Sequence, residues 1–225
     1  MKSKLKICLL TKSDFWCEIV RRFIIENFED PLIIVGDYRN WNYDNLDLMV
    51  TWEGDYIISY NSPWIVPETL LKKAKIAAIN FHPGSPNYPG RGCYNFAIWD
   101  DVKSYGCTCH YMLPKVDSGT IIRTISFPLF KNETIESLKE KTMSHMLCLF
   151  YEIMDYVLYD IPLRGNGEEW SRNPFTLKEF QELCDFTGKN NDIDRRIRAT
   201  YYPYGPDYPY IKIGKYKFEY KGKKI

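Results

Sequence analysis

This sequence has almost no excess of charge of either sign and no long apolar run. Its 30 Lys and Arg residues nearly balance its 29 Asp and Glu residues, so we expect no electrostatic footprint for duplex nucleic acid. No run approaches the about 20 apolar residues that a membrane span requires. The basic start is followed by a short apolar run that ends at Thr11, which predicts a first strand and not a signal peptide. We therefore expect neither a nucleic acid nor a membrane as partner.

Paired cysteines are also missing. The chain has seven cysteines, an odd number, without the close pairs typical of metal sites, which indicates reduced thiols in a cytoplasmic protein. Cys107 and Cys109 fall on an alternating segment where both share one face, so core packing is favoured over metal binding, and we expect no metal. Nothing in the sequence resembles a serine or cysteine nucleophile with its supporting base.

Strand and helix patterns alternate along most of the chain. Residues 6–10 and 32–35 are apolar runs typical of strands, and between them a helical stripe begins after a cap at Ser13. Further strands are predicted at residues 55–59, 76–79, 105–112 and 120–127, and helices at residues 68–75, 93–101 and 134–159. This order predicts an α/β fold with a Rossmann-like, open and mostly parallel sheet.

Residues 76–122 gather the polar side chains expected of an active site. Residues 76–79 are typical of a strand buried on both faces, and Asn80 and His82 follow at its carboxyl end, two apart and therefore on one side. Ligands of open α/β sheets bind at that end. The Pro- and Gly-rich residues 83–90 predict a shaped loop. Asp117 follows after one strand–helix–strand crossover, a unit of about 30 residues that is long enough to return its carboxylate to the same edge.

These motifs carry a family resemblance. Asn-x-His-Pro from Asn80, the Pro/Gly loop, and Asp-Ser-Gly-Thr-Ile from Asp117 resemble the signature of the formyltransferases that use N10-formyltetrahydrofolate. That group contains glycinamide ribonucleotide transformylase, methionyl-tRNA formyltransferase and the nucleotide-sugar N-formyltransferases. The resemblance covers roughly residues 5–127, and residues 197–203 look like a segment of the sugar-modifying branch. It implies the formyltransferase fold, with N10-formyltetrahydrofolate as cosubstrate.

The resemblance assigns roles to the three catalytic candidates. Asn80 would donate its amide to the oxyanion that forms on the formyl group, and His82 would stabilise that oxyanion and move a proton. Asp117 would orient or charge the imidazole and help to remove the proton from the ammonium intermediate. Which of His82 and Asp117 is the formal base stays open. We expect a supporting hydrogen bond from His110 and a packed or solvated His145.

Contacts to the two substrates are also implied by the resemblance. Trp64 and Ile65 would line the pterin slot, and residues 113–116 would close its other side through Leu113, Lys115 and Val116. The alternative is that Trp64 and Ile65 only pack their loop. Contacts to the acceptor are predicted for Ser85, Arg91 and Tyr202.

The chain divides at a change in character near residue 162. Residues 1–162 are predicted to form the catalytic domain, and residues 163–225 a small extension with two short helices and a tyrosine-rich hairpin at residues 211–218. A hairpin must pack on something, such as the body of the protein or a second subunit. Stacking of a nucleotide base on its aromatic residues is another possibility, and the resemblance suggests a homodimer.

The acceptor is predicted by elimination within the family. Residues 11–14 lack the glycines of the ribonucleotide branch, and the tail is shorter than the additional C-terminal domain of the methionyl-tRNA enzymes. Together with residues 197–203, this favours a nucleotide-linked amino sugar, a 3- or 4-amino deoxyhexose on dTDP. The alternatives are a formyltetrahydrofolate hydrolase, another amine formyltransferase, or a module that binds folate or nucleotide without catalysis.

Overall fold

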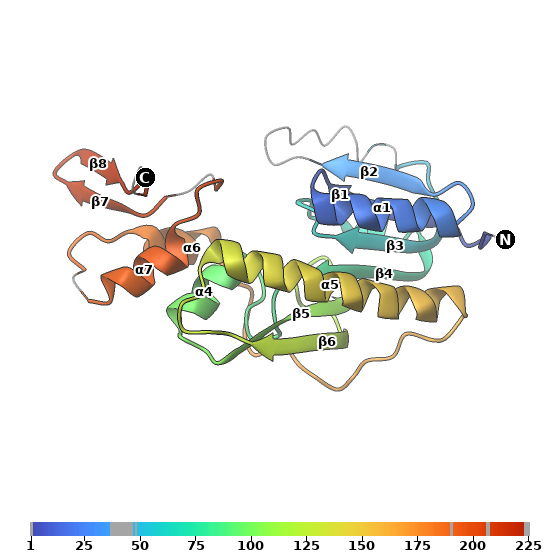
Figure 1. The fold of residues 1–225 in the computed structure, drawn as a ribbon. Helices are drawn as coiled ribbons and strands as arrows, with labels where there is room; N and C mark the ends of the chain where they lie inside the picture. Colours follow the sequence, from blue (N-terminus) through green and yellow to red (C-terminus); the bar gives the residue numbers. More distant parts are fainter. Residues whose placement is uncertain (1, 37–46, 48, 190, 206–207, 223–225) are drawn as a thin grey trace.

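The computed structural model describes residues 2–36, 47, 49–189, 191–205 and 208–222, and it is built around one six-stranded sheet (Figure 1). The strands of that sheet are β1 (Ile7–Lys12), β2 (Leu32–Gly36), β3 (Gly54–Tyr60), β4 (Ala74–His82), β5 (Ser104–Tyr111) and β6 (Ile121–Pro128). The helices are α1 (Phe15–Asn27), α3 (Glu68–Leu71), α4 (Cys93–Trp99), α5 (Ile135–Leu158), α6 (Leu177–Cys184) and α7 (Ile193–Thr200). A separate hairpin joins β7 (Tyr210–Ile213) to β8 (Tyr216–Glu219).

The strand order is β2-β1-β3-β4-β5-β6. The first four strands pair in parallel, and β5 pairs antiparallel with both of its neighbours, β4 and β6. The prediction of an open, mostly parallel α/β sheet is therefore confirmed. The crossover predicted between β4 and β5 is wrong in direction, because β5 runs antiparallel to β4. The short α4 ends in a turn where Asp101 adopts a left-handed conformation (φ 52°), and this turn reverses the chain.

Both sides of the parallel strands carry apolar clusters, which explains their continuous apolar sequences. In β1, Ile7 and Leu9 belong to the cluster covered by α1 and α5, whereas Cys8 and Leu10 belong to the cluster on the other side. The two helices lie over the same face of the sheet (Figure 1). Ile76 is an exception to the predicted double burial of β4. This residue is 53% exposed and belongs to neither apolar cluster, although Ala78 on the same face packs against the second one.

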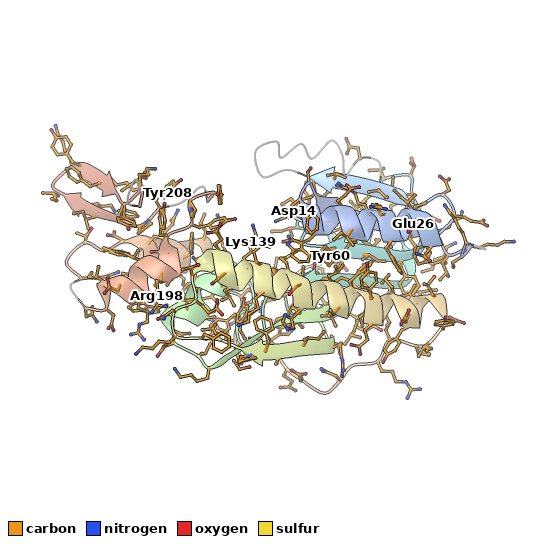
Figure 2. All side chains as sticks on the ribbon, in the orientation of Figure 1. Asp14, Glu26, Tyr60, Lys139, Arg198 and Tyr208 are labelled. Carbon is orange, nitrogen blue, oxygen red and sulfur yellow. The ribbon has the colours of Figure 1, made fainter. Side chains whose placement is uncertain are left out.

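The helix starts are fixed by side-chain caps. Asp14, labelled in Figure 2, accepts a hydrogen bond from the backbone nitrogen of Cys17 and caps α1. The cap predicted at Ser13 is wrong by one position, because the first helical residue is Phe15. Thr134 caps α5 in a reciprocal arrangement with Ser137. Each such cap contributes about 1 kcal/mol to helix stability.

The C-terminal elements gather beyond the N-terminal end of α5, next to α4 (Figure 1). Phe175, Phe180 and Ala199 share one apolar cluster with Phe96 of α4 and Leu138 of α5. The hairpin predicted at residues 211–218 is present as β7 and β8. The boundary at residues 162 and 163 stays a prediction, and the two parts it separates share this core. Within the described part of the chain, no helix is long and apolar enough to cross a membrane.

Candidate active site

Two neighbouring strands bring three polar side chains to one face of the sheet. Asn80 and His82 alternate with Ile79 and Phe81, which enter the cluster under α5, so the two polar side chains point to the opposite face. In the antiparallel register, Asn80 pairs with His110 of β5. Its amide nitrogen lies 3.1 Å from Nε2 of His110.

Asp117 reaches this face through the loop between β5 and β6, and not through the predicted crossover. Its backbone is left-handed (φ 41°), a conformation that Asp tolerates better than most residues. Gly119 allows the loop to fold close to β5, since a Cβ there would overlap the backbone oxygen of Tyr111. The Asp117 side chain is buried, with 6% of the residue exposed.

The carboxylate of Asp117 joins both histidines. Its Oδ2 lies 3.2 Å from Nδ1 of His82, and its Oδ1 lies 3.2 Å from Nε2 of His110. The backbone N–H of Gly90, in the Pro/Gly loop, donates to Oδ2 at 2.7 Å. Burial alone would raise the pKa of this carboxyl, but His82, His110 and the Gly90 N–H together hold its pKa well below its usual range. Asp117 is therefore an anion at neutral pH.

His82 is held at both ring nitrogens. Nδ1 faces Asp117, and Nε2 lies 2.9 Å from the backbone oxygen of Tyr88. Both partners are acceptors, so both hydrogen bonds form together only when the ring is protonated. The sequence predicted a hydrogen-bonding interaction of Asp117 with His82, and the structure brings these two groups together directly.

His110 links the other two polar groups. Its Nδ1 lies 2.8 Å from the backbone oxygen of Tyr111, so this nitrogen carries a proton. Nε2 faces both Asp117 and the amide of Asn80. A proton on Nε2 satisfies Asp117, whereas a lone pair there satisfies the amide nitrogen of Asn80. His110 makes the contacts of a supporting residue, as expected from its place in the sequence. His145 lies elsewhere, on α5, and packs 4.3 Å from the ring of Phe127.

Trp170 completes the cluster, and the sequence analysis missed it. Its ring centroid lies 5.0 Å from that of His110 and 5.9 Å from that of His82, edge to face in both cases. Its Nε1 donates to the backbone oxygen of Gly119 at 2.8 Å. The only sequence signal for Trp170 was a single tryptophan directly after the polar and glycine residues 164–169. In the structure these six residues are exposed.

A cavity of about 550 Å³ adjoins this cluster. Asp117 and Gly119 line it on one side and Trp170 on another, with the charged side chains of Lys115 and Arg172 also in its wall. This volume falls within the range of small-molecule sites. In the residues that the structure describes, no group of three or more His, Cys, Asp or Glu side chains is arranged to hold a metal ion.

The residues predicted to contact the pterin are placed in different environments. Trp64 is buried in the cluster on the side of the sheet opposite α5 and packs against Gly36, which matches the alternative that it packs its loop. Ile65, Leu113 and Val116 are exposed. Lys115 donates to Oδ1 of Asn173 at 2.7 Å. Their contacts with a folate stay predictions.

The residues predicted to contact the acceptor also differ in their surroundings. Ser85 is buried in the Pro/Gly loop, and the backbone nitrogen of Arg91, just past that loop, donates to the oxygen of Phe175 at 3.0 Å. Tyr202 belongs to the extension, where its hydroxyl accepts a hydrogen bond from Nζ of Lys139 at 3.0 Å. Lys139 projects from the N-terminal part of α5 (Figure 2).

The sequence model of the formyl transferase family matches residues 36–150, about half of the chain, and this segment contains all four members of the Asn80, His82, His110 and Asp117 cluster. The chain belongs to the formyl transferase family. The formyltransferase family predicted from the Asn-x-His and Asp motifs is thus confirmed.

Curated relatives of this formyltransferase include two methionyl-tRNA formyltransferases. That of Limosilactobacillus fermentum is 31% identical over 158 residues, which cover 68% of this chain and 49% of the relative. That of Bacillus thuringiensis subsp. konkukian is 26% identical over 179 residues, which cover 78% and 56%. The chain therefore spans about half the length of the curated relatives it matches.

Solved structures with the same fold include several sugar N-formyltransferases. The enzyme from Shewanella has a TM-score of 0.75 at 17% identity, with 96% of both chains covered. A 4-N formyltransferase from Francisella tularensis has a TM-score of 0.71 at 20% identity, covering 98% of this chain and 99% of that one. An N-formyltransferase from Helicobacter canadensis, solved with folinic acid and dTDP-3-aminofucose, has a TM-score of 0.66 at 19% identity, covering 87% and 80%. The predicted formyltransferase fold is confirmed.

Proposed function

We propose that this formyltransferase moves a formyl group from N10-formyltetrahydrofolate to the amine of a nucleotide-linked amino sugar, a 3- or 4-amino deoxyhexose on dTDP. The observation that carries the proposal is the convergence of Asn80, His82 and Asp117 beside the carboxyl end of β4. The choice of acceptor is supported by structural neighbours that are sugar N-formyltransferases and that match this chain over nearly its whole length.

The cluster suits acyl transfer to an amine without a covalent enzyme intermediate. The amine attacks the formyl carbon, and negative charge develops on the formyl oxygen. The amide of Asn80 and the Nε2–H of His82 are the donors for that charge, and a lost donor of this kind costs about 2.7–4 kcal/mol. The C–N10 bond then breaks, and the proton released by the amine passes to the departing nitrogen.

Asp117 has two tasks in this scheme. As a buried anion beside Nδ1, it accepts the Nδ1–H of His82 and lies next to the positive charge that the ring carries when it also donates Nε2–H to an oxyanion. Its hydrogen bond to Nδ1 also fixes the orientation of the His82 ring. In the structure, Nε2 of His82 contacts the oxygen of Tyr88, so a bound formyl group competes with this backbone oxygen for the same proton.

Substrate contacts follow from the exposed groups around the cluster. The apolar side chains of Ile65, Leu113 and Val116 offer surface for the pterin of the cosubstrate. We assign Lys115 to the same slot, with Trp64 as a buried support behind it. For the acceptor we retain three residues as proposed contacts, namely Ser85, Arg91 and Tyr202.

We also propose a cytoplasmic homodimer. Ile211, Ile213, Tyr216 and Phe218 are exposed apolar side chains of the hairpin. The register places Ile211 opposite Phe218 and Ile213 opposite Tyr216, so the four share one face. An exposed apolar face on a two-stranded hairpin supports pairing with a second copy. The seven cysteines form no disulfide in the described structure, which supports a reducing compartment.

The acceptor has one further candidate. The curated relatives at 31% and 26% identity are methionyl-tRNA formyltransferases, and this favours testing charged methionyl-tRNA beside the sugars. The balanced charge of the chain argues against a large polyanionic substrate.

The deciding experiment incubates the protein with N10-formyltetrahydrofolate and a panel of dTDP-linked amino sugars, with methionyl-tRNA and no acceptor as parallel arms. Mass spectrometry should detect the gain of one formyl group on an amino sugar. Formate release that is the same with and without acceptors would establish a hydrolase. Binding of folate by calorimetry, without turnover in any arm, would establish a non-catalytic module.

A further inference from the structure

The segment of residues 165–173, here called the strap, runs over the catalytic cluster and is tied to both loops that flank it. The backbone nitrogen of Asn166 donates to the oxygen of Ile121 at 3.0 Å, where β6 starts. The backbone nitrogen of Ser171 donates to the oxygen of Pro86 at 3.2 Å, in the Pro/Gly loop. Lys115 binds Asn173 from the loop that carries Asp117. The strap therefore joins the Asp117 loop to the Pro/Gly loop.

Trp170 is the residue of the strap that faces the two imidazoles. Residues 164–169 are exposed, whereas Trp170 is partly buried, with His110 and His82 at ring distances of 5.0 and 5.9 Å. Its Nε1 also donates a hydrogen bond to the backbone oxygen of Gly119. Trp170 also lines the 550 Å³ cavity, so its indole stands where the cavity meets the imidazoles.

The two imidazoles next to Trp170 are almost completely buried. His82 is 5% exposed and His110 is 2% exposed, although the cavity that Asp117 helps to line is large enough for many water molecules. The contacts of an aromatic ring with both imidazoles exclude water from that side. In a low-dielectric site the interactions of Asp117 with the histidines are stronger than they would be in water.

We propose that Trp170 is a positioning residue that shields His82, His110 and Asp117 from the water of this cavity, and that this shield makes the protein a transferase and not a formyl-folate hydrolase. The second half rests on the proposed function. If water replaces the amine, its oxygen bonds to the formyl carbon and the C–N10 bond breaks. N10 takes one proton from the water, and formic acid leaves and ionises to formate by releasing the other proton. The site has the groups for this reaction, so transfer depends on keeping water away.

The shield is tested without any formyl chemistry by reacting the protein with diethyl pyrocarbonate and following each histidine by peptide mass spectrometry. The chain has three histidines, and His145, remote from the strap, is the internal standard. We expect slow modification of His82 and His110 in the wild type and a rise of about tenfold or more in Trp170→Ala, as local protection is lost. Trp170→Phe, which keeps an aromatic ring, should stay near the wild-type rate.

A matched control is Trp99→Ala, because Trp99 is also partly buried but packs on Arg196 at 4.3 Å and not on a histidine. It should leave the three histidine rates unchanged. If Trp170→Ala does not give the wild-type circular dichroism spectrum, Trp170→Gln, which keeps part of the side-chain volume but brings polar atoms next to the imidazoles, is read in the same way. Unchanged rates at His82 and His110 in folded Trp170→Ala, or in the variant that replaces it, would overturn the shield.

The functional half is read as the ratio of formate released to formyl transferred. We expect this ratio to rise in Trp170→Ala and to stay close to the wild type in Trp170→Phe and Trp99→Ala. An equal fall of both products, with an unchanged ratio, would overturn the role in partitioning. If no acceptor is formylated by the wild type, the proposed function fails, whereas the modification rates still decide whether Trp170 shields the histidines.

Discussion

The Oδ2 atom of Asp117 lies 3.2 Å from Nδ1 of His82, and the same oxygen accepts the N–H of Gly90 at 2.7 Å. One carboxylate oxygen thus ties the end of β4, the Pro/Gly loop and the loop after β5 to a single point. Any change that moves one of these three segments alters the charge environment of His82.

Asp117→Asn should lower kcat by about 10²–10⁴-fold, the usual range for loss of a group that acts in proton transfer. The substitution keeps size and tolerates the left-handed backbone, so the fold should persist. Steady-state formylation measured by mass spectrometry is the readout. Asp101→Asn is the matched control, because Asp101 also has a positive φ (52°) but its carboxylate pairs with Lys103 away from the site. Equal activity of the two variants would contradict the role of Asp117.

Asp117 should also make stability depend on pH. The pKa of Asp117 in the folded protein is below its usual range, so the folded protein binds a proton at this carboxylate less tightly than the unfolded chain does. The stabilisation is fully present above the unfolded pKa of about 3.9 and is lost as the pH falls from there through the lower folded pKa. Urea unfolding from pH 6 to pH 3 should show the wild type losing part of its advantage over Asp117→Asn. A difference in free energy that is constant over this range would contradict the assignment.

Asn80→Ala should reduce kcat by about 10²–10³-fold, because the oxyanion loses a donor. The side chain is partly buried and its partner His110 keeps contacts with Asp117 and Tyr111, so circular dichroism and the melting temperature should change little. Asn27→Ala is the control, since the side chain of Asn27 donates to the Phe23 backbone oxygen at the end of α1, away from the site. Turnover by Asn80→Ala close to the wild-type rate would remove Asn80 from the mechanism.

Gly119→Ala should destabilise the protein by about 1–3 kcal/mol, the usual cost of inserting a methyl group into packed space. The new Cβ would overlap the backbone oxygen of Tyr111, so the loop that carries Asp117 must shift. Activity should fall together with stability. Gly188→Ala is the comparison, because Gly188 has a positive φ (69°) but open space around it, so only local backbone strain is added. Urea unfolding and formylation rates of the two variants test the difference.

Phe218→Lys should convert the proposed homodimer to a monomer, because it places a charge in the exposed apolar face of the hairpin. Size-exclusion chromatography with light scattering measures the mass directly. Lys215→Glu, which changes charge in the turn between β7 and β8, should leave the mass unchanged. A wild type that is already monomeric at micromolar concentration would contradict the dimer.

The sequence predicted most strands and helices where apolar runs are local features. The helix start at Ser13 was wrong by one position, and the helix expected at residues 68–75 ends at Leu71, because β4 already begins at Ala74.

The sequence also predicted that Asn80, His82 and Asp117 lie close together. The strand was expected to end before Asn80, whereas β4 includes both Asn80 and His82, and Asp117 arrives through the loop between β5 and β6 and not through the predicted crossover. The direction of β5 was wrong, since it depends on the turn at Asp101 and not on the alternation within the strand. Trp170 was missed because its contacts with His82 and His110 join distant parts of the chain, and no local pattern records them.

The strap has a practical consequence for protein engineering. A chimera that exchanges C-terminal regions between relatives, in order to change the acceptor, has an obvious junction just after α5. Such a junction would replace the indole beside the imidazoles with whatever residue the donor protein supplies. The backbone of Phe175 is hydrogen-bonded to Pro89 and Arg91. A junction placed after Phe175 would transplant α6, α7 and the hairpin and would leave Trp170 in place beside the imidazoles.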